Sequence, residues 1–201
     1  MKDNREPVRK LFAILCSYKI QPEALHFYLL EKVRARFFAG KEVLYDHQRI
    51  VRDAVFVYSG FLLIYGFDET GDRQLLGIQG SGRILLGKSF TRQSSSDLEL
   101  VALAGSYLLL LSHADVLQLF QRFEGTEAVA RIIMADYAEG EQLRLLLLKE
   151  RAEKVILSFY QDYPEFLAGG LLLDIDIASF LLIGEQTLRN VRMKLIRQGR
   201  L

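Results

Sequence analysis

Residues 174–198 carry the sequence DIDIASFLLIGEQTLRNVRMKLIRQ, which contains two short helical patterns. The first spans about residues 174–181 and the second about residues 185–198, and only Leu182-Ile183-Gly184 separates them. Two short helices joined by a turn of this length are typical of the helix-turn-helix. The apolar residues suit the small core of such a motif: Ile177, Ala178, Leu181, Ile183, Leu188 and Val191. The stretch therefore predicts a helix-turn-helix.

Positive charge is concentrated on the second of these helices. The whole chain has a formal net charge of +1, whereas residues 186–201 contain five basic residues and no acid. These residues are Arg189, Arg192, Lys194, Arg197 and Arg200. Basic side chains that contact phosphates supply much of the affinity of DNA-binding proteins. A solvated charged face is the alternative, but the bases coincide with the apolar spacing and the turn, so we predict DNA binding.

A long helical pattern precedes this motif. Ser112-His113-Ala114-Asp115 resembles a capping box, and we expect Thr126 to cap a longer helix that ends near Lys149. One face of that helix carries residues at spacings of three and four: Val129, Ile133, Tyr137, Gly140, Leu143 and Leu147. Such a stripe suits pairing with the same helix of a second copy, so we expect a dimer. The alternative is that the stripe packs on the β-domain of its own chain.

The first half of the chain consists of short strand patterns separated by turns. Regularly spaced strands with glycine turns predict an antiparallel sandwich or barrel. The expected strands span residues 33–37, 42–45, 54–58, 61–67, 74–79, 98–104 and 107–111, with turns at Ser59-Gly60 and at residues 68–72. We expect the last two strands to pair with each other. The chain then divides into a β-rich domain (residues 1–124), a long helix (125–149) and the helix-turn-helix domain (150–201).

Composition limits the possible classes of protein. The chain has 201 residues, half of them hydrophobic, and a single cysteine, Cys16, so we expect neither a disulfide nor a thiolate metal cluster. The N-terminus is charged and no apolar run could span a bilayer, so we expect a cytoplasmic protein. Gly80-Ser81-Gly82 lacks the lysine of a phosphate-binding loop, and no group of nucleophile, base or clustered carboxylates is visible. We therefore predict that the protein is not an enzyme.

The order of these parts resembles the Crp/Fnr family, which includes the cyclic-AMP receptor protein. The resemblance covers about Arg36 to Leu195, and residues 160–165 are similar to the branch common in Bacteroidetes. It rests on the segments 38–44, 55–60, 68–71, 177–181 and 187–192. It implies an α+β fold with an N-terminal cyclic-nucleotide-binding-like β-roll (a double-stranded β-helix or jelly roll). A long dimerisation helix and a C-terminal helix-turn-helix, with or without a wing, would follow.

The resemblance also implies roles for residues of the second helix. Its base-reading positions are Glu185, Gln186, Arg189 and Asn190, and Thr187 and Arg192 lie nearer the phosphates. Gln and Asn can pair with adenine, Arg with guanine, and Glu can accept from cytosine. Many members carry an acid and an arginine where this chain has Gln186 and Asn190, so we expect a different operator. Leu182 stands where the family usually has glycine, so we expect a distorted turn.

The cassette that holds a cyclic nucleotide in this family is incomplete here. In the family an acid of this cassette binds the ribose hydroxyl and an arginine binds the cyclic phosphate. Leu86-Gly87-Lys88 aligns with the first part but contains no acid. Ser96, which is followed by Asp97, aligns with the arginine. A carboxylate at a phosphate site costs affinity, so we predict that cyclic AMP is not the ligand. Arg83, Lys88 and Arg92 either meet another anion or lie in a solvated loop. The single cysteine and the unrelated histidines His26, His47 and His113 indicate neither an iron–sulfur cluster nor haem.

These features together predict a dimeric, DNA-binding transcription regulator. Its expected partners are a double-stranded DNA operator, a second copy of the chain, an unidentified small-molecule effector and RNA polymerase, with no membrane partner. The effector would shift the long helices and so reset the spacing of the two recognition helices. The alternative is a degenerate family member that acts through protein contacts without a ligand or specific DNA binding.

Overall fold

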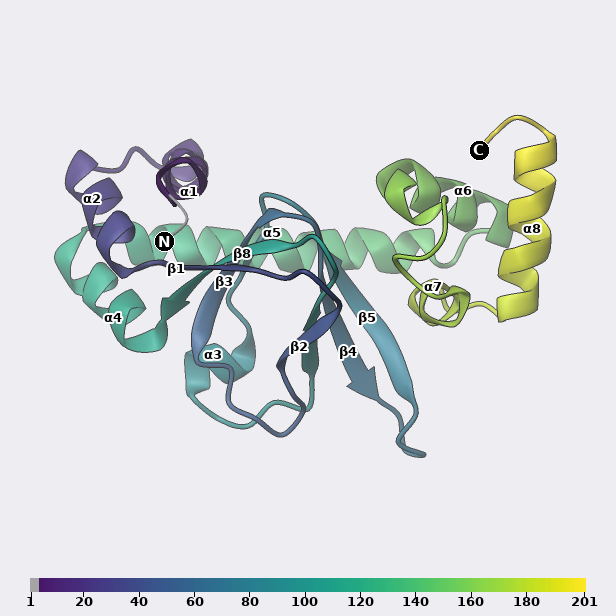
Figure 1. Cartoon of the computed structure of the whole chain (residues 1–201), viewed down its shortest axis with the longest axis horizontal. Coiled ribbons are helices and arrows are strands. Elements are labelled where there is room, and N and C mark those ends of the chain that lie inside the picture. Colours follow the sequence, from purple (N-terminus) through teal and green to yellow (C-terminus); the bar gives the residue numbers. More distant parts are fainter. Residues whose placement is uncertain (1–3) are drawn as a thin grey trace. The chain divides into compact units, whose positions relative to one another are not determined.

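A computed structural model describes residues 4–201 (Figure 1). The helices are α1 (Arg5–Tyr18), α2 (Glu23–Lys32), α3 (Lys88–Arg92), α4 (His113–Arg122), α5 (Thr126–Leu147), α6 (Ala152–Asp162), α7 (Asp174–Phe180) and α8 (Glu185–Arg197), with the 3-10 turn η1 (Pro164–Phe166). The strands are β1 (Arg34–Phe37), β2 (Glu42–Tyr45), β3 (Asp53–Ser59), β4 (Leu62–Phe67), β5 (Arg73–Gln79), β6 (Ile84–Leu85), β7 (Glu99–Ala102) and β8 (Tyr107–Ser112). The chain divides into two compact units. The β-unit comprises the residues up to Ile64 with Ile78–Asp136, and the C-terminal unit comprises Tyr65–Gly77 with Tyr137–Leu201.

The strands form two antiparallel sheets with the orders β1-β8-β3-β6 and β2-β7-β4-β5. Leu110 of the inner strand β8 lies opposite Arg34 of β1 and Val55 of β3. This arrangement confirms the predicted α+β fold with a β-roll. The predicted pairing of residues 98–104 with residues 107–111 is wrong, because β7 and β8 belong to different sheets. The short link between them crosses from one sheet to the other instead of closing a hairpin.

The link between β3 and β4 also crosses between sheets, and a glycine makes the crossing possible. Gly60 has a φ of +76°, and a Cβ at this position would lie 2.6 Å from both Cα and Oγ of Ser106. The buried Ser106 hydroxyl accepts from the Phe61 amide at 3.0 Å and donates to the Phe61 carbonyl at 2.9 Å. Glycine suits both the positive φ and the close approach. The predicted turn at Ser59-Gly60 is therefore confirmed.

Three helices, α1, α2 and α4, gather at one end of the roll (Figure 1). Their apolar side chains, including Val8, Leu25 and Val116, are buried in one core with those of β3 and β8. Ser112 caps α4 as predicted, since its hydroxyl accepts from the Asp115 amide at 3.1 Å. The predicted capping role of Thr126 is wrong. Its hydroxyl instead donates to the Phe123 carbonyl at 2.7 Å, and Thr126 is the first residue of α5.

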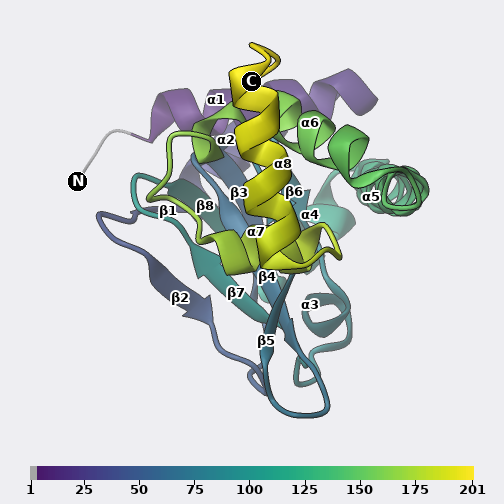
Figure 2. The same cartoon turned by 90° about the vertical axis from the view of Figure 1, so that its right-hand side faces the viewer.

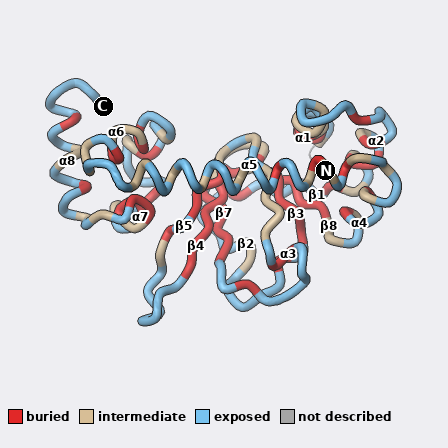
Figure 3. Tube along the Cα trace, turned by 180° about the vertical axis from the view of Figure 1, so that it is seen from behind, coloured by how far each residue is buried: buried red, intermediate tan, exposed pale blue. Residues whose placement is uncertain are grey.

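Helix α5 changes from buried to exposed along its length (Figure 3). Val129 and Ile133 near its start are 2% and 8% exposed, so they pack within their own chain, as the alternative prediction stated. Tyr137 and Leu147 are half-buried, whereas Gly140 and Leu143 are exposed. Only the second half of the predicted stripe is thus accessible to another molecule.

The helices of the C-terminal unit surround an aromatic cluster. The Phe159 ring of α6 lies 5.1–6.1 Å, between centroids, from four other rings: Tyr160, Tyr163, Phe166 and Phe180. The segment around β5 joins this unit through the Leu75 amide, which donates to the Ser179 hydroxyl of α7 at 3.0 Å. Within residues 4–201, no helix is both long enough and apolar enough to cross a membrane.

Candidate nucleic-acid interface

The turn between α7 and α8 is well formed. The Leu182 amide donates to the Ser179 carbonyl at 3.2 Å, and the Ile183 amide donates to the Ala178 carbonyl at 3.0 Å. These two bonds are the Schellman pattern that ends a helix, and the pattern needs a left-handed residue after the cap. Leu182 takes that conformation, with a φ of +53°. The expected distortion is therefore absent, and the turn instead holds a leucine in a backbone conformation that favours glycine.

The apolar positions of the motif meet in a small core. Ile177 and Leu188 are fully buried, and Ala178 is 4% exposed where α7 packs on α8 (Figure 2). Of the three further positions predicted there, Leu181 is 4% exposed, and Ile183 and Val191 are half-buried. Leu195 is fully buried but was missing from the predicted core. Its spacing of seven residues from Leu188 is the signal that identifies it.

A salt bridge fastens α8 to the start of α7. Arg192 donates to both carboxylate oxygens of Asp174, at 2.6 and 2.8 Å, and to the Tyr160 hydroxyl at 3.0 Å. The Arg192 guanidinium holds the pKa of the Asp174 carboxyl below its usual range, and the same contact raises the pKa of Arg192. The Arg192 and Asp174 side chains are 20% and 21% exposed. Arg192 therefore joins the two helices in the free chain, and the position near the phosphates that the resemblance implied for it stays a prediction.

The candidate base-reading residues lie in the N-terminal half of α8. Gln186 donates to the side-chain oxygen of Asn190 at 2.8 Å, one helical turn away. Arg189 donates to Asp174 at 3.1 Å and also pairs with Glu185. Thr187 is exposed on the same helix. The structure thus brings Glu185, Gln186, Arg189 and Asn190 onto one short stretch of helix, where they pair with one another.

The bases at the end of α8 pair with a single acid. Lys194 donates to Glu153 of α6 at 2.6 Å, and Arg200 contacts the other oxygen of the same carboxylate. Together these two contacts lower the pKa of Glu153. Among residues 4–201, Arg197 is the base of this group for which no ion pair is seen. Most of the predicted positive charge is therefore balanced within the chain.

Sequence patterns did not identify Asp174, Tyr160 and Glu153 as part of this surface. Asp174 lies 18 residues before Arg192, and Glu153 lies 41 residues before Lys194. Neither separation corresponds to neighbours on one helix, which are three or four residues apart. Only the packing of α6, α7 and α8 brings these groups together.

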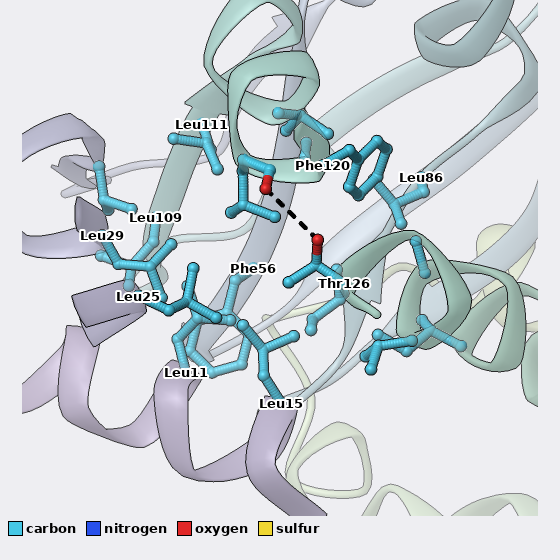
Figure 4. Close-up of a pocket in the computed structure, with 18 of the residues that line it drawn as sticks. Leu11, Leu15, Leu25, Leu29, Phe56, Leu86, Leu109, Leu111, Phe120 and Thr126 are labelled. Atoms are coloured by element: carbon cyan, nitrogen blue, oxygen red, sulfur yellow. Dashed lines mark hydrogen bonds between the residues drawn. The ribbon is translucent and has the colours of Figure 1, made fainter. Parts of the chain in front are cut away.

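The residues of the predicted ligand cassette differ in burial and in their surroundings. Ser96 is 7% exposed, and its hydroxyl accepts from the Leu98 amide at 3.0 Å. Arg83, Lys88 and Asp97 are exposed, and Gly87 only precedes the five-residue helix α3. Leu86 lines an apolar cavity (Figure 4). No group of three or more His, Cys, Asp or Glu residues that could hold a metal is found in the described part of the chain.

Solved structures share this fold. FixK2 from Bradyrhizobium japonicum matches with a TM-score of 0.70 at 17% identity, over 83% of this chain and 86% of its own. The catabolite activator protein of Thermus thermophilus matches with a TM-score of 0.56 at 18% identity, over 92% of this chain and 88% of its own. A Eubacterium rectale chain assigned to the Crp/Fnr family of transcriptional regulators has a TM-score of 0.69 at 12% identity, over 89% of this chain and 85% of its own.

These likenesses confirm the predicted resemblance to the Crp/Fnr family at the level of the fold. The Bacteroidetes branch stays a prediction. No family model and no curated protein matches the sequence.

Proposed function

We propose that this chain, which has the fold of the Crp/Fnr regulators, is a dimeric transcription regulator that binds operator DNA through α8. One observation carries the proposal most directly. Helices α7 and α8 form a complete helix-turn-helix, and α8 presents Glu185, Gln186, Arg189 and Asn190 on its outer surface. This is the part of a recognition helix that contacts base edges in the major groove.

The chemistry of these side chains suits direct readout. Arg189 can donate to the two acceptors of guanine, and Gln186 or Asn190 can pair with adenine. In the free protein Arg189 is held by Asp174 and Glu185, so binding exchanges one set of charged hydrogen bonds for another. Of these two partners Glu185 lies on α8, one helical turn before Arg189, and Asp174 lies at the start of α7, so we expect the exchange to need only rotation of the Arg189 side chain. Thr187 and Arg197 are the groups that we assign to phosphates.

A dimer would pair the exposed part of α5. Ile132, Leu143 and Leu146 are 42%, 61% and 60% exposed. At about 100° per residue they lie within about 60° of one another around the helix. Gly140 lies beside them and allows close approach of a second helix. We place the contact there with Leu147 at its edge, while Tyr137 lies about 140° from Ile132 around the helix and Val129 and Ile133 belong to the β-unit core.

We assign the roles of the domains, the ligand and the other partners from the fold of the Crp/Fnr regulators. Residues 1–124 act as a sensor, residues 125–149 as the dimerisation helix and residues 150–201 as the DNA-binding domain. The sensor does not take cyclic AMP, since Ser96 and Asp97 replace the phosphate-binding arginine and add a negative charge. It needs no metal, haem or iron–sulfur cluster and catalyses no reaction. RNA polymerase is a further partner, and the protein works in the cytoplasm.

Selection of DNA sequences tests this function. The purified full-length protein is incubated with a pool of random duplexes, and the bound fraction is sequenced over several rounds. We expect a two-fold symmetric motif whose half-sites are separated by about one helical turn, or 10 base pairs. Enrichment of no motif at low salt would overturn the proposal.

The degenerate alternative has one observation in its favour. Acids of the same chain pair with four bases of this region: Arg189, Arg192, Lys194 and Arg200. This pairing weakens the positive electrostatic potential that attracts DNA. A chain that acts only through protein contacts would give no enriched motif in the selection. The same experiment therefore distinguishes the two functions.

A further inference from the structure

Met193 is an exposed apolar residue on α8, the helix that we assign to DNA. Its exposed fraction is 47%, whereas Leu188 and Leu195 of the same helix are fully buried. At about 100° per residue, Met193 lies about 140° from Leu188 and about 160° from Leu195 around the helix. Its side chain therefore points away from the core of the helix-turn-helix. Packing of that core does not explain why a large apolar residue stands at this position.

The neighbours of Met193 on the helix surface are predicted base-reading residues. Arg189 and Asn190 precede it by four and three residues, which is the spacing of neighbours on a helix. Gln186 precedes it by seven residues and lies about 20° away around the helix. Helical side chains lean toward the N-terminus, so Met193 covers the turn that carries Arg189 and Asn190. Met193 therefore shares the surface on which bases would be read.

The amide pair on this surface indicates which base it would bind. Gln186 donates from Nε2 to Oδ1 of Asn190 at 2.8 Å. In this pair the Gln186 oxygen is left as an acceptor and the Asn190 nitrogen as a donor. Adenine presents the complementary groups in the major groove, an amino donor at N6 and an acceptor at N7. Guanine presents two acceptors there and would leave the Gln186 oxygen without a donor.

An adenine in the major groove is accompanied by a methyl group. The thymine paired with it presents its C5 methyl in the same groove, where apolar side chains contact it. Met193 is an exposed apolar side chain within one turn of Asn190. It is also unbranched and flexible, so it can adapt its conformation to the position of the methyl.

We propose that Met193 is a specificity-determining residue that contacts the thymine methyl of an A·T pair whose adenine is bound by Gln186 and Asn190. The inference rests on the proposed function and deepens it, because it names a base pair that each half-site should contain. Sequence patterns did not single out Met193, since an apolar residue at helical spacing is first assigned to a core. Burial of one methyl group corresponds to about a threefold to fivefold change in affinity.

Removal of single methyl groups from the DNA tests the contact. Each thymine of the duplex obtained by selection is replaced in turn by deoxyuridine, which keeps the base pair and lacks only the methyl. Affinity is measured by fluorescence anisotropy at one fixed salt concentration. We expect one thymine of the half-site at which the replacement weakens wild type about threefold to fivefold. Met193→Ala should bind the original duplex more weakly by a similar factor and lose no further affinity at that deoxyuridine.

Two further variants control for effects of the substitution itself. Met193→Leu keeps an apolar side chain and should restore most of the dependence on the methyl. Ile196→Ala is the matched control, because Ile196 is also an exposed apolar residue of α8, at 41%, but lies further from the N-terminal turns that read bases. It should keep the full dependence. Thermal melting confirms that each variant is folded.

The possible failures are distinguishable. A selected motif that wild type binds without dependence on any thymine methyl would overturn this inference and leave the proposed function standing. The same holds if Met193→Ala keeps the wild-type dependence at every thymine. Enrichment of no motif in the selection would overturn the proposed function and this inference together.

Discussion

At the scale of single residues, the Asp174–Arg192 salt bridge holds the two helices of the motif in register. It joins the first residue of α7 to the middle of α8, and Tyr160 of α6 completes it. Hydrogen bonds to charged groups contribute about 1.5–3 kcal/mol each when they replace contacts with water. We expect Asp174→Asn to lower the free energy of unfolding by about 2 kcal/mol, while Asp162→Asn, at the exposed end of α6, changes it little. Urea unfolding at pH 7 measures both.

The same salt bridge gives stability a dependence on pH. The pKa of Asp174 is lowered in the folded chain, mainly by the bond from Arg192. The contribution of this ion pair to the free energy of unfolding is therefore complete above the unfolded pKa of about 3.9. It is lost as the pH falls through the lower pKa of the folded chain. The difference in unfolding free energy between wild type and Asp174→Asn should be constant from pH 7 to about 5 and shrink below about 4. A difference that grows on acidification would contradict this assignment.

Leu182 shows how one residue can store strain in an otherwise regular turn. Leu182 is 72% exposed and has a φ of +53°. Its side chain therefore contributes little burial energy, while its left-handed backbone conformation is unfavourable for a residue other than glycine. We expect Leu182→Gly to stabilise the protein by about 0.5–1 kcal/mol, less than the full strain because glycine is more flexible when unfolded. Leu182→Ala keeps the strained backbone and is the control. Stabilisation by alanine equal to that by glycine would show that the side chain is responsible instead.

Sequence analysis could identify Leu182 but not Asp174. The turn position of Leu182 follows from the lengths of the two helical patterns. The partner of Arg192 depends on how three helices pack, which local periodicity does not encode.

At the scale of elements, a carboxylate of α6 neutralises one base of α8 and one base that follows it. Glu153 of α6 binds both Lys194 and Arg200, so two bases are neutralised by one carboxylate. We expect Glu153→Gln to raise affinity for non-specific DNA roughly three- to tenfold at low salt and to steepen the dependence of log affinity on log salt by about one. Glu150→Gln is the matched control, because Glu150 pairs at 2.9 Å with Lys154 of α6 itself. Equal effects of the two variants in fluorescence anisotropy would contradict the role of Glu153.

Most elements followed from sequence, but their pairing did not. The capping box at Ser112 and the spacing of the C-terminal helices located those elements to within one or two residues. The two-residue strand β6 and the five-residue helix α3 are too short to give a periodic signal. Strand partners in a roll are set by links that cross between sheets, as at Gly60, and alternation alone does not distinguish such a link from a hairpin turn.

At the scale of the whole molecule, the proposed dimer depends on one side of α5. Leu143 and Leu145 have similar exposed fractions, 61% and 52%, but lie about 200° apart around the helix. We expect Leu143→Arg to convert the dimer into a monomer, since it buries an unpaired charge between the helices. Leu145→Arg should leave the dimer intact. Light scattering after gel filtration measures the mass, and dissociation by Leu145→Arg alone would place the contact on the other side.

The central claim is that α8 reads DNA sequence, and fluorescence anisotropy tests it most directly. Wild type, Arg189→Ala and Arg197→Ala are titrated, at one fixed salt concentration, onto the duplex obtained by selection and onto a scrambled duplex. We expect wild type to prefer the selected duplex, Arg189→Ala to lose roughly tenfold to a hundredfold of that preference, and Arg197→Ala to weaken both duplexes alike. Equal binding of the two duplexes by wild type, or an unchanged preference in Arg189→Ala, would contradict the claim.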